Sequence, residues 1–273
     1  MSGRAGSSGP GERAPGTGAD AAGPGAPGDP GDFGVWETHA AWWQAEFTEG
    51  ADVEYEEQIL PLAADELAGA RRVLDLGCGE GQIARLAVAK AGAERVVGLD
   101  PAAAQLATAA RRGGGPGYVR GRAERLPFPA AAFDAVVTCL VLEHLTDLDA
   151  ALDEVARVLA PGGRFVLFTN HPLFQTPGSG WIDDQILDPP EQYWRVGPYL
   201  PESVTHEEVD AGVRLPFFHR PLSRYVNALA ARGLLVTRME EPAPPPGFLA
   251  RAPEYAGAAS IPRLLLLRSE KLR

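Results

Sequence analysis

The stretch Val73-Leu-Asp-Leu-Gly-Cys-Gly-Glu-Gly81 decides the fold of this chain, because a short apolar run ends in three closely spaced glycines. Glycine has no side chain, so a turn built on Gly77, Gly79 and Gly81 lets backbone amides approach a ligand closely. A helical pattern follows over residues 82–90. A strand, a glycine-rich turn and a helix in this order predict a nucleotide-binding unit of an α/β sheet.

Short apolar runs alternate with helical patterns from residue 72 onward, which is typical of repeated βαβ units and a largely parallel sheet. Strands are expected at residues 73–76, 96–99, 118–121, 133–140, 164–169, 234–239 and 261–267. Helices are expected at 82–90, 102–112, 148–159 and from Pro221 onward. Pro161-Gly-Gly163 cannot continue a helix, so the fifth strand should begin at Arg164. The fold class is therefore α/β, with a Rossmann-like, mostly parallel seven-stranded sheet and helices on both faces.

Composition divides the chain into segments. Residues 1–34 are mostly Gly, Ala, Pro and Ser and cannot bury enough apolar surface to offset ordering entropy, so we expect a disordered tail. Residues 35–70 place aromatic and aliphatic side chains at helical spacing and predict a helical cap. The sheet domain then covers residues 71–273, with an aromatic lid inserted after the fifth strand at about 171–218. Residues 242–249 are too rich in proline for a helix or a strand.

Charge and cysteine usage restrict the classes of partner. The 273 residues include 36 acidic and 25 basic side chains, a formal net charge of −11, which opposes binding to nucleic acid or to an anionic bilayer. No apolar stretch has the length of a membrane span or the form of a secretory signal. Two cysteines without paired spacing predict no metal site and a reduced, cytoplasmic setting. We expect a small-molecule substrate; the oligomeric state stays open.

Two other interpretations are disfavoured. A dinucleotide fingerprint requires glycine where Gln82 stands, which argues against a nicotinamide-dependent oxidoreductase. Asp188-Pro-Pro-Glu191 is similar to the Asp-Pro-Pro-Tyr signature of nucleic-acid amino methyltransferases. That signature belongs at the end of the fourth strand, whereas this tetrapeptide follows the fifth.

Ordered motifs in the first two thirds of the chain resemble those of class I S-adenosylmethionine-dependent methyltransferases of the small-molecule type. The motifs are Leu74–Gly81, Gly98–Asp100, Leu126–Pro129, Phe133–Val136 and Arg157–Gly163. Five matches in the right order are far more specific than a glycine loop alone. The resemblance implies S-adenosylmethionine as cofactor, an antiparallel last strand, and methylation of an oxygen, nitrogen or carbon of a metabolite. The alternative is a non-catalytic S-adenosylmethionine-binding or regulatory protein of the same fold.

The resemblance also carries over a cofactor-binding set by position. It comprises Asp75, Gly77, Cys78, Gly79, Asp100, Pro101, Ala123, Glu124, Cys139 and Leu140. Asp100 ends the second strand, where a carboxylate accepts hydrogen bonds from both ribose hydroxyls. Glu124 follows the third strand beside the expected adenine, and Cys139 and Leu140 would contact the methionine amine through their backbone. Many relatives carry an aspartate at position 122 or 123, so here the adenine contact depends on Glu124 and on backbone groups.

Three histidines are candidates for a catalytic base, because an acceptor hydroxyl benefits from one near neutral pH. His171 follows the fifth strand where the lid begins and is the leading candidate. His144 follows the fourth strand near the expected cofactor, where a hydrogen bond to the backbone of a strand-helix turn would explain it equally well. His219 precedes a helix, where capping or anchoring of the lid explains it without chemistry.

Overall fold

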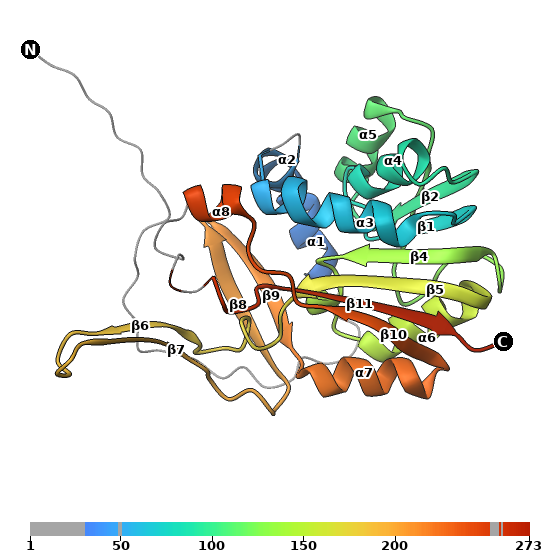
Figure 1. Ribbon diagram of the computed structural model, residues 1–273. Coiled ribbons are helices and arrows are strands. Elements are labelled where there is room, and N and C mark those ends of the chain that lie inside the picture. The colour runs from blue at the N-terminus through green and yellow to red at the C-terminus, as the bar shows by residue number, and fades with distance from the viewer. Residues whose placement is uncertain (1–30, 49–50, 252–256, 258) are drawn as a thin grey trace, which may run out of the picture.

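A computed structural model describes residues 31–48, 51–251, 257 and 259–273 (Figure 1). Most of the segment predicted to be a disordered tail, residues 1–30, lies outside this description. The last four residues of that segment instead belong to the first helix, α1 (Gly31–Thr38). The ordered cap therefore includes residues that composition alone assigns to the tail.

Seven strands form the central sheet. They are β1 (Arg72–Leu76), β2 (Arg95–Asp100), β3 (Gly117–Arg120), β4 (Phe133–Cys139), β5 (Leu159–Asn170), β10 (Leu234–Glu240) and β11 (Leu264–Lys271). Their order is β10-β11-β5-β4-β1-β2-β3, and β11 runs antiparallel to both of its neighbours. The predicted Rossmann-like sheet with an antiparallel last strand is confirmed. Because β1 lies between β2 and β4, the strand order reverses at β1, which is where such sheets bind ligands.

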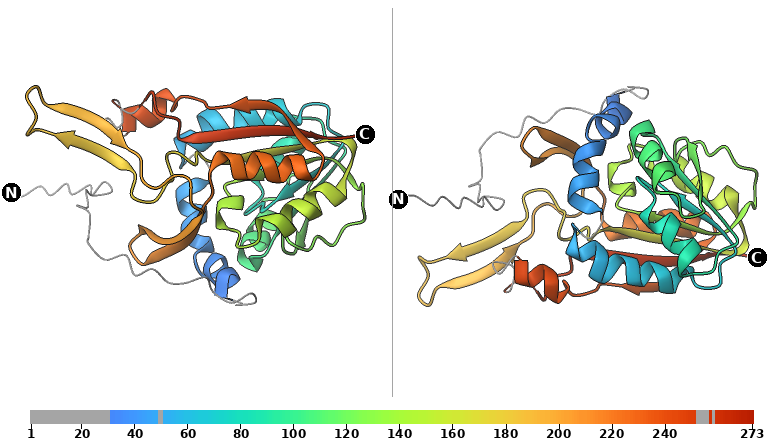
Figure 2. Two further views of the ribbon diagram at one scale, coloured as in Figure 1. Left: turned by 90° about the horizontal axis from the view of Figure 1, so that it is seen from below. Right: turned by 90° about the horizontal axis from the view of Figure 1, so that it is seen from above.

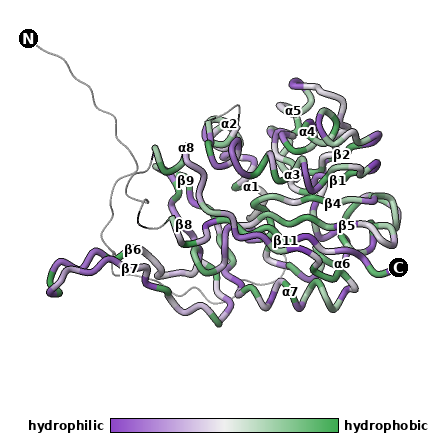
Figure 3. Tube along the Cα trace, viewed as in Figure 1, coloured by the Kyte–Doolittle hydropathy of each residue, from purple (hydrophilic) through white to green (hydrophobic). Residues whose placement is uncertain are grey.

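Helices cover both faces of the sheet and create two cores. One face carries α3 (Leu60–Leu67) and α4 (Gln82–Ala89), and the other carries α6 (Leu148–Val158) and α7 (Leu222–Ala231). Successive strand residues point to opposite faces, so Val136 joins the α6 and α7 core while Val137 joins the core of α3 and α4. Both faces of these strands are buried, which accounts for their unbroken apolar sequences. Hydrophobic residues accordingly gather along the central strands (Figure 3).

The cap and the lid lie at the carboxyl edge of the parallel strands. The cap contains α1, α2 (Ala40–Phe47), the π-helical turn η1 (Tyr55–Ile59) and α3; α5 (Ala103–Arg112) packs beside β2 and β3. The lid consists of two hairpins, β6 (Gly180–Asp184) with β7 (Glu191–Arg195), and β8 (Ser203–Asp210) with β9 (Val213–His219). The β6–β7 hairpin projects away from the body in every view (Figures 1 and 2), whereas β9 contacts α1.

Several details differ from the sequence-based expectations. Strand β5 begins at Leu159 instead of Arg164, because Pro161-Gly-Gly163 forms an irregularity within the strand and does not precede it. Strand β11 begins at Leu264, after Pro262, which has no N–H to donate to a ladder. The proline-rich segment does contain a helix, α8 (Pro246–Arg251), whose proline occupies a first-turn position that needs no N–H donor. Strand β4 ends at residue 139 and not 140.

Candidate functional site

The glycine loop between β1 and α4 has a backbone that only glycine adopts readily. Gly77, Gly79 and Gly81 have φ angles of +74°, +52° and +86°. A methyl group on Gly77 would collide with the side chain of Val141, and one on Gly81 would collide with Tyr118. Backbone conformation and packing therefore both require glycine at positions 77 and 81, and the turn built on the three glycines is called the glycine cradle below.

Asp100 closes this cradle from the end of β2. One carboxylate oxygen accepts the N–H of Gly79 at 2.9 Å, and the other accepts the N–H of Ala102 at 2.8 Å. A carboxylate has about four acceptor positions, so each oxygen can still accept a hydroxyl. Asp100 is only 8% exposed, and this burial raises the pKa of its carboxyl to about 6. The structure thus brings Asp100 to the glycine loop.

Asp75, in β1, lies beneath the loop and is almost completely buried. Its carboxylate accepts the N–H of Ala84 at 2.8 Å and so joins β1 to α4. Burial, with the neighbouring charge of Asp100, raises the pKa of this carboxyl to about 7. Asp75 therefore supports the loop through α4 in addition to lying near the predicted methionine portion.

Glu80 is a buried acid within the loop that the sequence analysis did not select. It is 2% exposed, and its carboxylate pairs with Arg85 at 2.8 Å and with Arg112. The pairing ties the loop to α4 and α5. An acidic residue inside a glycine loop, followed five residues later by arginine, is the signal that could have found it.

The predicted adenine residues follow β3 in a turn that begins beside Asp100. The N–H of Gly121 donates to the Asp100 carbonyl at 3.1 Å, and the Pro101 carbonyl accepts from Arg120 at 2.9 Å. Ala123 is buried within the turn, where it joins the core shared with α6, and Glu124 is half-buried. The backbone thus holds this turn next to the residue predicted to bind the ribose.

Cys139 and Leu140 lie where β4 reaches the same edge of the sheet. Leu140 has a φ of +55°, unusual for a residue with a side chain, and its N–H donates to the Phe168 carbonyl at 3.0 Å. Such backbone strain persists only where the surroundings impose it, as they often do at functional sites. Cys78 and Cys139 are both reduced, and burial raises the pKa of both thiols.

The cap covers the loop from outside the sheet. The Trp43 indole nitrogen lies 3.8 Å from the position that a Gly79 methyl group would take. The Glu37 carboxylate accepts the N–H groups of Ala103 and Ala104, at 2.6 and 3.2 Å, where α5 begins. Glu37 also contributes to the raised pKa of the nearby Asp100. Helical spacing predicted a cap, but its contacts with the site depend on tertiary structure.

His171 and His219 are each held through a ring nitrogen. His171 Nε2 lies 2.8 Å from Glu241, while its Nδ1 accepts the N–H of Leu173 at 3.1 Å. His219 Nε2 donates to the Tyr199 carbonyl at 2.7 Å, and its Nδ1 is buried. Both histidines connect the lid to neighbouring backbone or side chains.

His144 is placed differently, in the short turn η2 (Leu142–His144) that follows β4. Its Nδ1 donates to the Pro216 carbonyl of β9 at 2.7 Å. Its ring packs between Trp36 of α1 and Phe217 of β9, with centroids 4.8 and 4.6 Å away. Burial lowers the pKa of the imidazole, which favours the neutral form. His144 is thus the candidate that touches both the cap and the lid.

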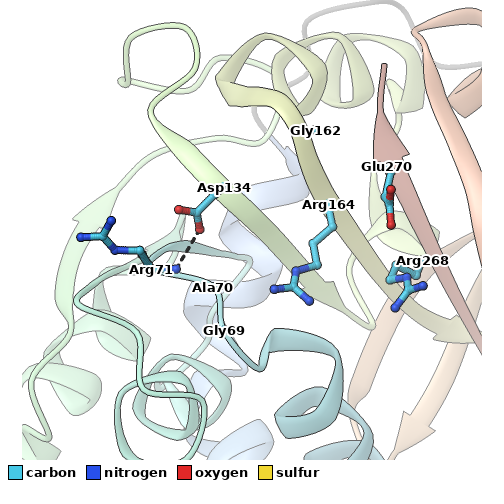
Figure 4. A pocket seen from close by; sticks show the side chains of 8 residues that line it. All are labelled: Gly69, Ala70, Arg71, Asp134, Gly162, Arg164, Arg268 and Glu270. Atoms are coloured by element: carbon cyan, nitrogen blue, oxygen red, sulfur yellow. Dashed lines mark hydrogen bonds between the residues drawn. The ribbon is translucent and has the colours of Figure 1, made fainter. Parts of the chain in front are cut away.

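A cavity of about 300 Å³ lies at the opposite, amino-terminal edge of β1, β4 and β5 (Figure 4). It is lined by Gly69, Ala70, Arg71, Asp134, Gly162, Arg164, Arg268 and Glu270. Arg71 already pairs with Glu94, and Arg268 lies beside Glu66. None of the site residues predicted from the sequence lines this cavity.

Comparison with known proteins identifies the family. Residues 74–167 match a family model described as a methyltransferase domain. The crystal structure of an S-adenosylmethionine-dependent methyltransferase from Mesorhizobium loti is 31% identical, with a TM-score of 0.67, and the match covers 79% of this chain and 97% of that one. A demethylmenaquinone methyltransferase from Thermobifida fusca is 34% identical over 175 residues, which are 58% of this chain and 71% of that protein. The chain belongs to the S-adenosylmethionine-dependent methyltransferases.

Other relatives match this methyltransferase over a shorter span. A demethylmenaquinone methyltransferase from Thermus thermophilus is 37% identical over 127 residues, which are 45% of this chain and 57% of that protein. The chain spans about half the length of the curated relatives it matches first, from 46% to 57%. The family implies S-adenosylmethionine as the cofactor. The glycine cradle and the spare acceptor positions of Asp100 fit such a ligand.

Within residues 31–48, 51–251, 257 and 259–273, no helix has both the length and the apolar character to cross a membrane. The same residues contain no group of three or more His, Cys, Asp or Glu side chains arranged to hold a metal ion.

Proposed function

We propose that this methyltransferase transfers the methyl group of S-adenosylmethionine to a small-molecule acceptor. The observation that carries the proposal is the glycine cradle at the strand-order reversal, closed by a carboxylate with unused acceptor positions. Nucleosides bind in this crevice of open α/β sheets. The relatives named as methyltransferases support the same activity.

The proposed cofactor contacts follow the chain around the carboxyl edge. Asp100 accepts the ribose hydroxyls, with Pro101, Ala123 and Glu124 beside the adenine. The methionine portion lies against Asp75, Gly77, Cys78 and Gly79, and the backbone of Cys139 and Leu140 meets its amine. The bound cofactor supplies an electrophilic methyl group; the protein aligns the acceptor with it and excludes water.

The acceptor side of the site is formed by the cap and the lid. Trp36 of the cap and Phe217 of the lid both face His144, which supports an apolar or aromatic metabolite as acceptor. Relatives from Thermus thermophilus, Deinococcus radiodurans and Thermobifida fusca carry the name demethylmenaquinone methyltransferase, which is consistent with a ring-containing small molecule. We propose a cytoplasmic setting and no nucleic-acid partner, in keeping with the net charge of −11.

Calorimetry with S-adenosylmethionine and S-adenosylhomocysteine tests the cofactor assignment directly. Asp100→Asn should weaken binding at least tenfold while the circular dichroism spectrum stays unchanged, because the amide replaces a charged acceptor and presents a donor to one hydroxyl. Wild-type affinity in this variant would refute the ribose role. The charge-matched control is Asp153→Asn, at an exposed position of α6.

Transfer is tested with deuteromethyl-labelled S-adenosylmethionine and a metabolite extract, followed by mass spectrometry. The proposal expects at least one metabolite to gain the labelled methyl group. Cofactor binding without any labelled product would instead support a non-catalytic S-adenosylmethionine-binding protein.

A further inference from the structure

The three histidines differ in the property that a base needs, a ring nitrogen with a lone pair that can accept a proton. In His171 the N–H of Leu173 occupies Nδ1, and Nε2 carries the hydrogen donated to Glu241. In His219 the lone pair belongs to Nδ1, which is fully buried. In His144 the Nδ1 hydrogen is donated to a carbonyl, so the lone pair is on Nε2. Among the described residues, that Nε2 has no hydrogen-bond partner.

The lid sets this protonation state, and the residue that follows β9 holds the turn that carries His144. The Pro216 carbonyl can only accept, so it requires the hydrogen of His144 to be on Nδ1. Arg220, which is 4% exposed, donates to the carbonyls of Leu142 at 2.9 Å and of Leu145, on either side of the histidine. The turn that carries His144 is thereby held by β9 and the residue that follows it.

The rings that pack against the His144 imidazole are aromatic and uncharged. Trp36 comes from α1 and Phe217 from β9, and neither side chain titrates. The charged groups nearby are Glu143, from the same turn, and the Arg220 guanidinium that holds that turn. An acceptor that reaches Nε2 therefore meets two aromatic rings, which favours a flat ring system.

We propose that His144 takes the proton of a phenol-type hydroxyl, so that the site methylates an oxygen on an aromatic ring. This inference rests on the proposed methyltransferase function. The hydroxyl proton moves to Nε2 while an oxygen electron pair forms the bond to the methyl carbon, and the pair of the broken carbon–sulfur bond stays on sulfur. The imidazolium then gives its proton to water.

Chemistry favours a hydroxyl over an amine at this position. A hydroxyl oxygen that is methylated with its proton still attached becomes positively charged, so a neighbouring base lowers the barrier. A neutral amine already has a lone pair available for attack. A single neutral imidazole beside the acceptor is therefore best suited to a hydroxyl.

The first test observes His144 without any turnover. The full-length protein, labelled with ¹⁵N-histidine and loaded with S-adenosylhomocysteine, is titrated by NMR, with His144→Gln to assign the signal. We expect a hydrogen on Nδ1, a pKa below that of a free histidine, and a shift of the Nε2 resonance on adding 2-naphthol but not 2-naphthylamine. A hydrogen on Nε2, or no response to 2-naphthol, would overturn the inference.

The second test follows labelled methyl transfer to 2-naphthol. His144→Gln should lower the rate about 10²- to 10⁴-fold at pH 7, and the rate should then rise about tenfold per pH unit as the phenol ionises by itself. His206→Gln, at an exposed position of β8, is the matched control and should keep the wild-type profile. Methylation of 2-naphthylamine only, or a His144→Gln profile without recovery at high pH, would contradict the role.

The outcomes distinguish this inference from the function on which it rests. If S-adenosylhomocysteine does not bind and no methyl group is transferred, the proposed function fails. If cofactor binds and a methyl group is transferred, but His144→Gln keeps the wild-type rate and pH profile, only the inference about His144 fails.

Discussion

At the scale of single residues, the glycine loop combines backbone strain with close packing, and the two contributions can be separated. Gly77→Ala places a methyl group at a φ of +74° and against the Val141 side chain. We expect the free energy of unfolding to fall by about 2–4 kcal/mol, from left-handed backbone strain and overpacking together. Urea denaturation measures this loss, and calorimetry should show that cofactor binding is lost as well.

Gly92→Ala is the matched control for that experiment. Gly92 has nearly the same φ, +72°, but a methyl group there meets no atom within 4 Å. It should cost only about 1–2 kcal/mol and leave cofactor binding unchanged. Equal losses in both variants would show that the contact with Val141 contributes nothing.

The raised pKa of Asp75 predicts that its contribution to the free energy of unfolding falls as pH rises, which is the reverse of the usual behaviour of a carboxyl group. Burial raises its pKa to about 7, above the unfolded value of about 3.9, so the folded state binds the proton more tightly. The contribution of this group to the free energy of unfolding is therefore most favourable below pH 4 and falls as pH rises towards 7. Above pH 7, the buried charge costs roughly 2–4 kcal/mol.

Asp75→Asn should remove that cost, because the amide oxygen can still accept the Ala84 N–H. Urea denaturation is expected to show a variant more stable than wild type at pH 8, with the difference shrinking towards pH 4. A variant that is equally destabilised at both pH values would show that the carboxylate is not the source.

At the scale of elements, the lid strand β9 and the adjacent Arg220 hold His144, the proposed base, in position. Lysine at position 220 keeps the charge but cannot donate to several carbonyls with the fixed geometry of a guanidinium. In Arg220→Lys, NMR should show His144 with a mixture of hydrogen positions and a pKa nearer to that of free histidine. Arg232→Lys, at the end of α7, should leave the His144 signal unchanged. An unaltered signal in Arg220→Lys would contradict the positioning role.

The strands that are predicted well from the sequence are those buried on both faces of the sheet, because such burial gives an unbroken apolar run. Strands β1, β4 and β5 read as apolar runs because helices cover both faces, and Asp100 could be selected because it follows such a run. Strands β6 and β7 have mostly exposed or half-buried residues on both faces, so no alternation marks them. Their pairing was therefore not predictable beyond the presence of an insertion.

The same distinction applies to the candidate site. The glycine loop, Asp75 and Asp100 are local to their motifs, so residue type and order predict their location. The ranking of the histidines depends on Pro216, 72 residues away from His144, and on Glu241, 70 residues away from His171. Hydrogen-bond partners at such separations are determined by tertiary packing, which a single sequence does not reveal.

At the scale of the whole molecule, one buried acid links the N-terminal cap to the C-terminal strands. Glu66 of α3 is 1% exposed and lies 2.6 Å from Arg238 of β10 and 3.6 Å from Arg268 of β11. These arginines are partly exposed, so solvent screens part of the interaction. Because the contact joins segments 172 residues apart, it should couple the unfolding of the cap to that of the sheet.

Glu66→Gln tests this coupling, because it removes the charge and keeps the shape. We expect a loss of about 1–3 kcal/mol in the free energy of unfolding, since two guanidinium groups lose their shared carboxylate. Glu94→Gln breaks the exposed pair with Arg71 and should cost less than Glu66→Gln, because solvent screens both charges. In a background with Trp181→Phe and Trp194→Phe, tryptophan fluorescence follows the cap, because the remaining tryptophans lie in α1 and α2. Far-ultraviolet circular dichroism follows the sheet. The link is established if the two transitions coincide in wild type and separate in Glu66→Gln, with the cap unfolding at lower urea. If the two transitions coincide in both proteins, apolar packing alone joins the cap to the sheet.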